Sequence, residues 1–366
     1  MAFSPENRKG TISGIIFVAI VAASATYIAG LGPIKSLGIS PLVVGIVIGI
    51  FYANTLHNHF PSSWETGIVF SAKKILRFAI VFYGFRLTFQ QIIDVGPAGI
   101  TVSAVMLTTT FLLGTWLGMK VFGLDRDTSM LTASGASVCG AAAVLATEPV
   151  LKAEGHKAAV AVSMVVLFGT ISMFLYPVLY ATIIEPATGF LHMTPEQFGI
   201  YTGGTIHEVA QVVAVPNSIP GAPEVMANDA VIVKMTRVIM IAPMLIVLGL
   251  VLSYMARKKG GAGDKLKLVI PWFAVYFIVV AGLNSVIHAY TLTASADIAG
   301  MIKQTITQVN VVDTFLLTMA MTALGMGTRF AKFKGLGLAP VYTAGGMFVW
   351  LVIGGFVVTK MVVSVL

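Results

Sequence analysis

The feature that most constrains this chain is a succession of apolar runs, most of them near the ~20 residues that a helix needs to cross a bilayer. Of its 366 residues, 57% are hydrophobic and only 10% are charged, and the mean hydropathy is +0.91, which excludes an ordinary soluble domain. We therefore predict an all-α polytopic membrane protein with about eleven transmembrane segments. The predicted segments are 11–31, 41–56, 67–92, 97–119, 129–149, 158–183, 198–215, 230–255, 268–289, 308–329 and 336–360.

The charge pattern and the absence of a phosphate-loop motif argue against two other classes of function. The formal charge is +8, but the basic residues lie mostly in short segments between apolar runs, where they orient a membrane protein rather than bind nucleic acid. The sequence contains no Gly-x-x-x-x-Gly-Lys-Ser/Thr phosphate loop. This favours a secondary transporter or a channel over an enzyme, and we expect no cofactor.

Lysine and arginine in the loops predict the orientation. If the N-terminus is cytoplasmic, most basic loop residues lie inside, including those of the 257–267 loop, and the C-terminus lies outside. The first segment follows Arg8 and Lys9 and resembles a signal peptide, with Ala23-Ser24-Ala25 as a cleavage site. Because the apolar run continues toward Gly30, we expect an uncleaved anchor.

The fifth segment is long enough to enter a membrane but poorly built to cross it. Thr132–Pro149 reads TASGASVCGAAAVLATEP, in which glycines loosen the helix and Pro149 cannot continue it. An interrupted helix exposes N–H groups and a positive dipole end that can hold a small anion. The alternative is a tightly packed continuous helix, since small residues also let helices approach. The candidate anion-binding residues here are Ser134, Gly135, Ser137, Cys139 and Gly140.

The short seventh segment carries the second candidate site. His207, Glu208 and Gln211 crowd one turn, and burying such groups in a membrane is costly unless they have partners or a function. If the segment is helical, His207 and Gln211 share a face. The spelling nearly matches the His-Glu-x-x-His zinc motif, but glutamine is a poor zinc ligand, so no metal is expected. We predict a coupling cluster, against the alternative that the three residues only satisfy one another.

For the other charged residues we predict simpler roles. Lys234 and Arg237 share a face of the eighth segment, so either could help to bind an anion, and we include Arg237 in the predicted site. Arg86 is expected at the membrane interface. Asp313 is expected to cap the start of the tenth segment.

Short patterns predict close helix contacts and a repeat. Gly45 with Gly49, and Gly114 with Gly118, form Gly-x-x-x-Gly pairs that mark helix contacts. Residues 79–84 weakly echo residues 320–325. With eleven segments the two copies would point in opposite directions, so 67–120 and 308–360 are suspected inverted-repeat elements within one transporter unit.

Several motifs resemble those of the sulfate exporter family of bacterial membrane proteins. They are GASVCGAAA at 135–143, ATEP at 146–149, HEVAQVV at 207–213, YGFRLT at 83–88 and DTFLL at 313–317. The resemblance covers nearly the whole chain. It implies a secondary carrier with ten or eleven helices, distantly similar to bile-acid/sodium symporters and sodium/proton antiporters. Such carriers have inverted repeats, a core domain with broken, crossing helices, and a panel-like domain.

Taken together, these patterns predict a multi-pass transporter of the bacterial inner membrane that exports or exchanges a small anion such as sulfate or a related sulfur oxyanion. Ser134–Gly140 with Arg237 would bind the substrate, and His207, Glu208 and Gln211 would couple transport to a proton or sodium ion. A cation/proton antiporter that uses Glu208 is one alternative, and a channel or membrane receptor is another. A homodimer is also an open alternative.

Overall fold

The computed structural model describes residues 3–32, 34, 40–258, 272–329, 331 and 337–366. No strand occurs among these residues, in agreement with the predicted all-helical fold. Within the same ranges, six helical stretches are long and apolar enough to cross a membrane, and shorter apolar helices accompany them. The predicted count of eleven segments therefore stays a prediction. The six stretches are Arg8–Ala29, Phe89–Val121, Gly155–Ile184, Glu224–Tyr254, Ala296–Gly327 and Leu338–Val365.

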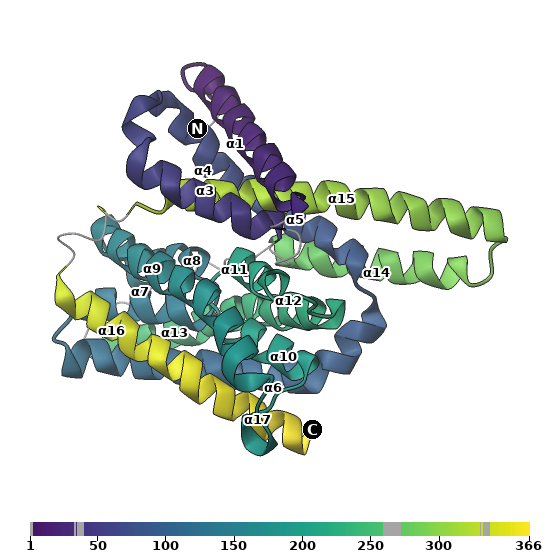
Figure 1. Cartoon of the computed structure of the whole chain (residues 1–366). Helices are drawn as coiled ribbons and strands as arrows, with labels where there is room; N and C mark the ends of the chain where they lie inside the picture. The colour runs from purple at the N-terminus through teal and green to yellow at the C-terminus, as the bar shows by residue number, and fades with distance from the viewer. Residues whose placement is uncertain (1–2, 33, 35–39, 259–271, 330, 332–336) are drawn as a thin grey trace. The chain divides into compact units, whose positions relative to one another are not determined.

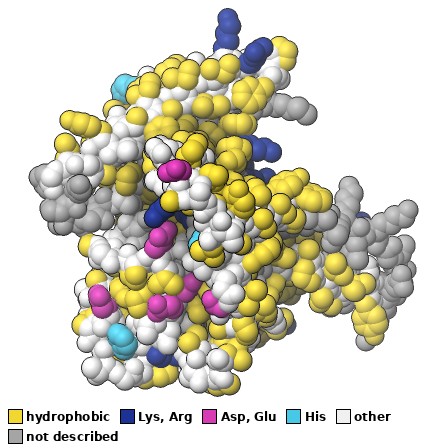
Figure 2. All heavy atoms as spheres, turned by 90° about the vertical axis from the view of Figure 1, so that its right-hand side faces the viewer, with side chains coloured by type: hydrophobic (Ala, Val, Ile, Leu, Met, Phe, Trp, Pro, Cys, Tyr) yellow, Lys and Arg dark blue, Asp and Glu magenta, His cyan; other side chains and the backbone are white. Residues whose placement is uncertain are grey.

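Hydrophobic side chains cover much of the face shown in Figure 2. The exposed apolar residues include Ile20, Phe51, Leu112, Val247 and Val286. A soluble protein rarely exposes contiguous apolar surface on this scale, whereas lipid tails cover such side chains at no cost in hydration.

The chain divides into two compact units. Unit 1 comprises residues 1–94, 213–224 and 273–331, and unit 2 comprises residues 95–212, 225–272 and 332–366. Both units are built from segments far apart in the sequence. In Figure 1, unit 1 combines purple helices with light-green ones, and unit 2 combines teal helices with yellow ones.

Unit 1 is organised around one long helix. Its helices are α1 (Arg8–Ala29), α3 (Pro41–Thr55), α4 (Glu65–Phe70), α5 (Leu76–Tyr83), α14 (Trp272–Thr291, whose first residue falls in unit 2) and α15 (Ala296–Gly327). The predicted contact at the first glycine pair is confirmed: a Cβ added at Gly45 or Gly49 would strike Thr322 of α15. A core of Val18, Tyr52, Ile68 and Met319 lies beside this crossing.

Unit 2 contains most of α6 (Phe89–Trp116) and the helices that carry the candidate site. These are α7 (Arg126–Ser137), α8 (Ala141–Leu151), α9 (Gly155–Leu179), α10 (Pro195–Thr205), α12 (Glu224–Ile239), α13 (Ile241–Lys258), α16 (Leu338–Val349) and α17 (Gly355–Val365). The second glycine pair also marks contacts as predicted, since Gly114 faces Met347 and Gly118 faces Ser129. Leu131, Val144, Val165 and Leu248 belong to the core of this unit.

Two predictions fall partly outside the described residues. Positions 259–267 of the loop predicted to be cytoplasmic are among the residues that the structure does not describe. The same is true of Phe330 and positions 332–336 within the suspected repeat element 308–360. The inverted repeat and the orientation remain predictions.

Candidate functional site at two interrupted helices

The predicted interruption of the fifth segment is confirmed. Helix α7 ends at Ser137, α8 begins at Ala141, and the three residues between them leave the helical path. Gly140 has a φ of 74° and a ψ of −137°, a combination that a residue with a Cβ rarely adopts. Glycine at this position therefore allows the chain to stop one helix and start the next inside unit 2.

A second interruption lies in the seventh predicted segment. Helix α10 ends at Thr205, and Ile206 turns to an extended conformation, with a φ of −71° and a ψ of 146°. Helix α11 (Val209–Ala214) then begins beyond Glu208. His207 therefore lies before the helix that carries Gln211. The two residues are not on one helix, so they do not share a helical face.

Lys234 of α12 joins the two interruptions. Its Nζ atom donates hydrogen bonds to the carbonyl oxygens of Val138 at 2.6 Å, Ile206 at 2.7 Å and His207 at 2.7 Å. The side chain is fully buried. An ammonium group has three donors, so these three carbonyls use all of them.

Arg237, one helical turn further along α12, binds the same two helix ends. It donates from Nε to the carbonyl oxygen of Ser137, from one Nη atom to Gly204 at 2.7 Å, and from the other to Ala136 at 2.8 Å. The last carbonyls of a helix lack intrahelical donors, and the helix end carries a partial negative charge. Buried cations are well suited to satisfy both needs, which explains why Lys234 and Arg237 share one face.

The small polar residues of α7 tie it to α8. Ser134 Oγ donates to the carbonyl oxygen of Ala143 at 3.1 Å and lies 2.7 Å from Thr147 Oγ1. Ser137 Oγ donates to the carbonyl oxygen of Ser134 at 3.2 Å. Both serines are fully buried, so their hydroxyls are engaged within the protein.

Gly135 and Cys139 are also buried in the packing around the interruption. A Cβ at Gly135 would lie 2.5 Å from Val165 and 2.8 Å from Val144, so the absence of a side chain allows α7 to pack closely there. Cys139 is a buried free thiol with an exposed fraction of 7%. Thr147, which the sequence marks only as part of the ATEP motif, is the further residue that bonds here, from the second turn of α8.

Glu208 lies directly against Gly140. A Cβ added at Gly140 would be 2.6 Å from Glu208 Cγ and 3.1 Å from Glu208 Oε1. The backbone N–H of Glu208 donates to Gln211 Oε1 at 3.1 Å. The side chain of Glu208 is thereby placed at the start of α8, where the helix dipole is positive.

His207 and Gln211 retain hydrogen-bonding capacity. Their exposed fractions are 2% and 0%. Among the described residues, His207 Nδ1 and Gln211 Nε2 have no hydrogen-bond partner. Gln211 packs against Gly169 of α9, where a Cβ would overlap the amide group. Buried polar groups are usually satisfied, so these two nitrogen atoms are free to bind a ligand, Gln211 Nε2 as a donor and His207 Nδ1 as a donor or an acceptor according to its tautomer.

A separate buried ion pair lies in unit 1. Arg86 Nη2 is 3.3 Å from Asp313 Oδ2, and the same nitrogen donates to Thr314 Oγ1 at 2.8 Å and to the carbonyl oxygen of Asn310 at 2.9 Å. Helix α15 begins at Ala296, well before Asp313. The prediction that Asp313 caps this helix is therefore wrong, because the helix begins before it and continues to Gly327.

The predicted position of Arg86 at the membrane interface stays a prediction, but its contacts are now defined. Its guanidinium lies 5.0 Å from the centroid of the Tyr83 ring, and its side chain is only 19% exposed. The pairing with Asp313 holds it inside unit 1, because a buried carboxylate needs a charged partner.

Fold and site define a multi-pass helical membrane protein in which two interrupted helices meet at buried cations. A family model described as Conserved hypothetical protein 698 matches residues 13–344. The UPF0324 membrane protein of Pseudomonas putida is 46% identical over 359 residues, 98% of this chain and 96% of that protein.

Two further relatives give similar values. The UPF0324 inner membrane protein YeiH of Escherichia coli K12 is 43% identical, over 97% of this chain and 95% of that protein. The UPF0324 membrane protein of Bacteroides thetaiotaomicron is 41% identical, over 95% of this chain and 98% of that protein. The chain belongs to the UPF0324 family of membrane proteins.

Proposed function

We propose that the protein is a secondary transporter of a small anion, such as sulfate or a related sulfur oxyanion, and that the anion binds beside the interrupted helices of unit 2. The observation that carries this proposal is the buried amide donor Gln211 Nε2, which has no acceptor among the described residues, together with the ring nitrogen Nδ1 of His207, which also has no partner among them. An unsatisfied buried donor costs about 1–3 kcal/mol. An oxyanion offers several acceptor oxygens and no obligatory donors, so it suits such groups.

The charge of the site favours an anion over a cation. The two helix C-termini contribute roughly −0.5 each and the N-termini that follow them roughly +0.5 each, so the helix ends nearly cancel. Lys234 and Arg237 supply two positive charges, and Glu208 supplies one negative charge. The two cations outnumber the one carboxylate, so the surplus is about one positive charge. This balance argues against the alternative of a cation/proton antiporter.

Glu208 is the proposed coupling group. Its carboxylate lies at the start of α8, next to Gly140 and where an anionic substrate would be attracted. Two negative charges at one buried place repel each other. Proton binding to Glu208 would remove this repulsion while the anion is bound, so proton and anion binding would be linked.

The remaining predicted site residues fit supporting roles. Arg237 contributes charge to the site, while its donors bind the carbonyls of Ser137, Gly204 and Ala136. Ser134, Ser137 and Cys139 shape the interruption. We further propose that the protein works in the bacterial inner membrane, which is where the name of the Escherichia coli relative places that protein.

Liposomes that contain purified protein test the proposal. We expect uptake of labelled sulfate, sulfite or an organic anion that saturates with concentration and is accelerated by unlabelled anion on the far side. Gln211→Met should reduce anion affinity, whereas Thr110→Val, which removes a buried hydroxyl that also lacks a partner among the described residues, should not. Flux that does not saturate would indicate a channel, and proton-coupled cation flux without anion transport would support the antiporter.

A further inference from the structure

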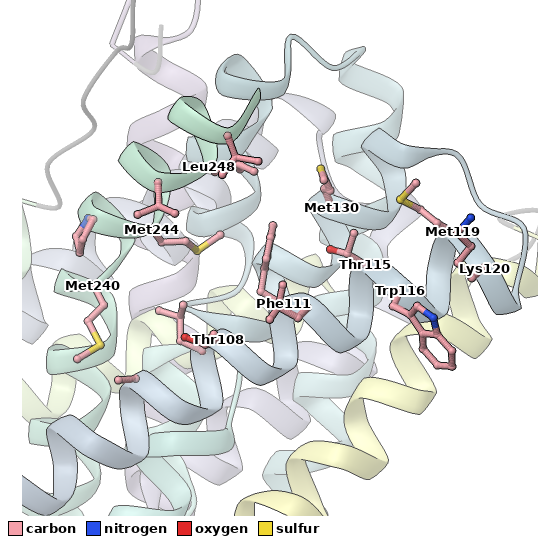
Figure 3. A pocket seen from close by; sticks show the side chains of 16 residues that line it. Thr108, Phe111, Thr115, Trp116, Met119, Lys120, Met130, Met240, Met244 and Leu248 are labelled. Carbon is pink, nitrogen blue, oxygen red and sulfur yellow. The ribbon is translucent and has the colours of Figure 1, made fainter. Parts of the chain in front are cut away.

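A long apolar groove runs along unit 2 between α6 and α13, with Met130 of α7 in its lining (Figure 3). Its volume is about 610 Å³, within the ~300–1,000 Å³ typical of ligand pockets. Phe111, Leu112, Met244, Val247 and Leu248 are among its lining residues. Leu112 and Val247 are 63% and 60% exposed, so the groove opens onto the surface of unit 2.

One end of the groove carries a tryptophan and a lysine in place of purely apolar side chains. Trp116 and Lys120 lie there, at the last turns of the α6 stretch (Figure 3). Tryptophan and lysine are the residues that anchor membrane helices at the level of the lipid headgroups. The groove is therefore apolar along its length and has a cation of interfacial type at one end.

Lys120 differs from Arg126 and Lys157, two other basic residues of unit 2. Arg126 pairs with Asp127 at 3.0 Å, and Lys157 pairs with Asp125 at 2.9 Å. In the described part of the chain, no carboxylate lies within ion-pair distance of Lys120, which is exposed. The ammonium group of Lys120 is therefore available to a negatively charged group at this end of the groove.

The length of the groove matches a lipid tail. Its lining along α6 extends from Ala104 to Lys120, roughly 24 Å at helical rise. That is longer than one leaflet of the hydrocarbon core, about 15 Å, and shorter than the whole core of about 30 Å. An acyl chain anchored at Lys120 therefore stays within the groove over its full length.

We propose that this groove is a binding site for an anionic glycerophospholipid. One acyl chain lies between α6 and α13, and the headgroup phosphate pairs with Lys120. A second copy of this chain would also cover apolar surface, but it would not by itself provide a negative charge at Lys120. The proposal does not depend on the transported substrate.

Fluorescence quenching of Trp116 tests the site directly. The chain has four tryptophans, so replacing Trp64, Trp272 and Trp350 by phenylalanine leaves Trp116 as the only one. The protein is placed in bilayers that contain brominated phosphatidylglycerol or brominated phosphatidylcholine with the same acyl chains. We expect about a fivefold preference for the anionic lipid, the ratio that corresponds to the ~1 kcal/mol of one lysine near a charged headgroup.

The variants make the assignment specific. Lys120→Gln should abolish the preference, whereas Lys303→Gln, which removes an exposed lysine from α15, should leave it unchanged. Equal quenching by both lipids, or no quenching by either because protein covers the groove, would refute the proposal. Native mass spectrometry of the wild-type protein and Lys120→Gln gives a second measurement that needs no tryptophan replacement: the wild type should retain phosphatidylglycerol selectively, and equal retention by the two proteins would also refute the site.

Discussion

Lys234 Nζ donates a hydrogen bond of 2.6 Å to the carbonyl oxygen of Val138, the residue that follows the end of α7. The same ammonium group binds the carbonyl oxygens of Ile206 and His207 beyond the end of α10. One side chain thus satisfies two interrupted helices that are about 70 positions apart in the sequence. The geometry of the candidate site depends on this cation being present.

Lys234→Met should therefore destabilise the protein strongly. Each buried carbonyl left without a donor costs about 1–3 kcal/mol, so we expect a loss of roughly 3 kcal/mol or more. Lys360→Met is the matched control, because Lys360 donates to the carbonyl oxygen of His192 near the surface and its loss should cost about 1 kcal/mol or less. Thermal unfolding in detergent measures both; equal midpoints would show that Lys234 does not hold the helix ends.

Replacement of Gly140 should impair folding as well as binding. From the sequence alone, Gly140→Val is expected to weaken anion binding much more than folding. The positive φ of 74° makes any Cβ strained, at about 1–3 kcal/mol, and the Cβ would also meet Glu208. We now expect Gly140→Ala to lower the unfolding midpoint measurably, whereas Gly345→Ala, whose Cβ would lie 3.4 Å from Phe168, should change it little. Similar midpoints would show that the interruption relaxes without glycine.

Glu208→Gln should remove the pH dependence of transport while the protein stays folded. Glutamine keeps the shape of the side chain beside Gly140 but cannot gain or lose a proton. The measurement is the pH profile of anion uptake into liposomes by the wild type and the variant. Glu148→Gln, on α8 but away from the interruption, is the control. A wild-type pH profile in Glu208→Gln would make Glu208 structural.

The Arg86–Asp313 pair should contribute more to stability than the Arg329–Glu65 pair of the same unit. The Asp313 side chain is fully buried, whereas the Glu65 side chain is 48% exposed. Removing one partner of a buried pair costs about 3–5 kcal/mol, and breaking an exposed pair costs about 0–1 kcal/mol. Asp313→Asn should thus lower the unfolding midpoint far more than Glu65→Gln. Equal effects of the two substitutions would indicate that water reaches Asp313.

Asp125, in the loop before α7, should make stability depend on acidic pH. Burial alone would raise its pKa, but hydrogen bonds from Thr128 and Lys157 lower the pKa to about 2, from 3.8. Because the folded pKa is below the unfolded one, this stabilisation is present above about pH 3.8 and is lost as the pH falls toward 2. Asp125→Asn keeps the helix cap but not the charge, so it should lower the unfolding midpoint near pH 6 and have little effect near pH 2. A constant difference across this range would exclude Asp125 as the cause.

Much of the fold follows from local rules. Apolar runs of spanning length predict helices because lipid offers the backbone no hydrogen bonds. Gly140 predicts the interruption of the fifth segment, and the glycine pairs predict close contacts with other helices, because these residues act on the backbone at their own positions. The expectation that Pro149 cannot continue the helix is wrong, since Pro149 lies inside α8, which continues to Leu151. Family motifs such as HEVAQVV at 207–213 can likewise be recognised in the sequence.

What only the tertiary structure decided is which groups satisfy one another. Lys234 and Arg237 could be seen to share a helix face, but their acceptors are carbonyl oxygens, which every residue has and no sequence pattern distinguishes. The approach of Glu208 to Gly140, the pairing of Arg86 with Asp313 and the groove that ends at Lys120 likewise join segments far apart in the chain. Local sequence sets where a helix can stop, whereas packing determines which charge lies at its end.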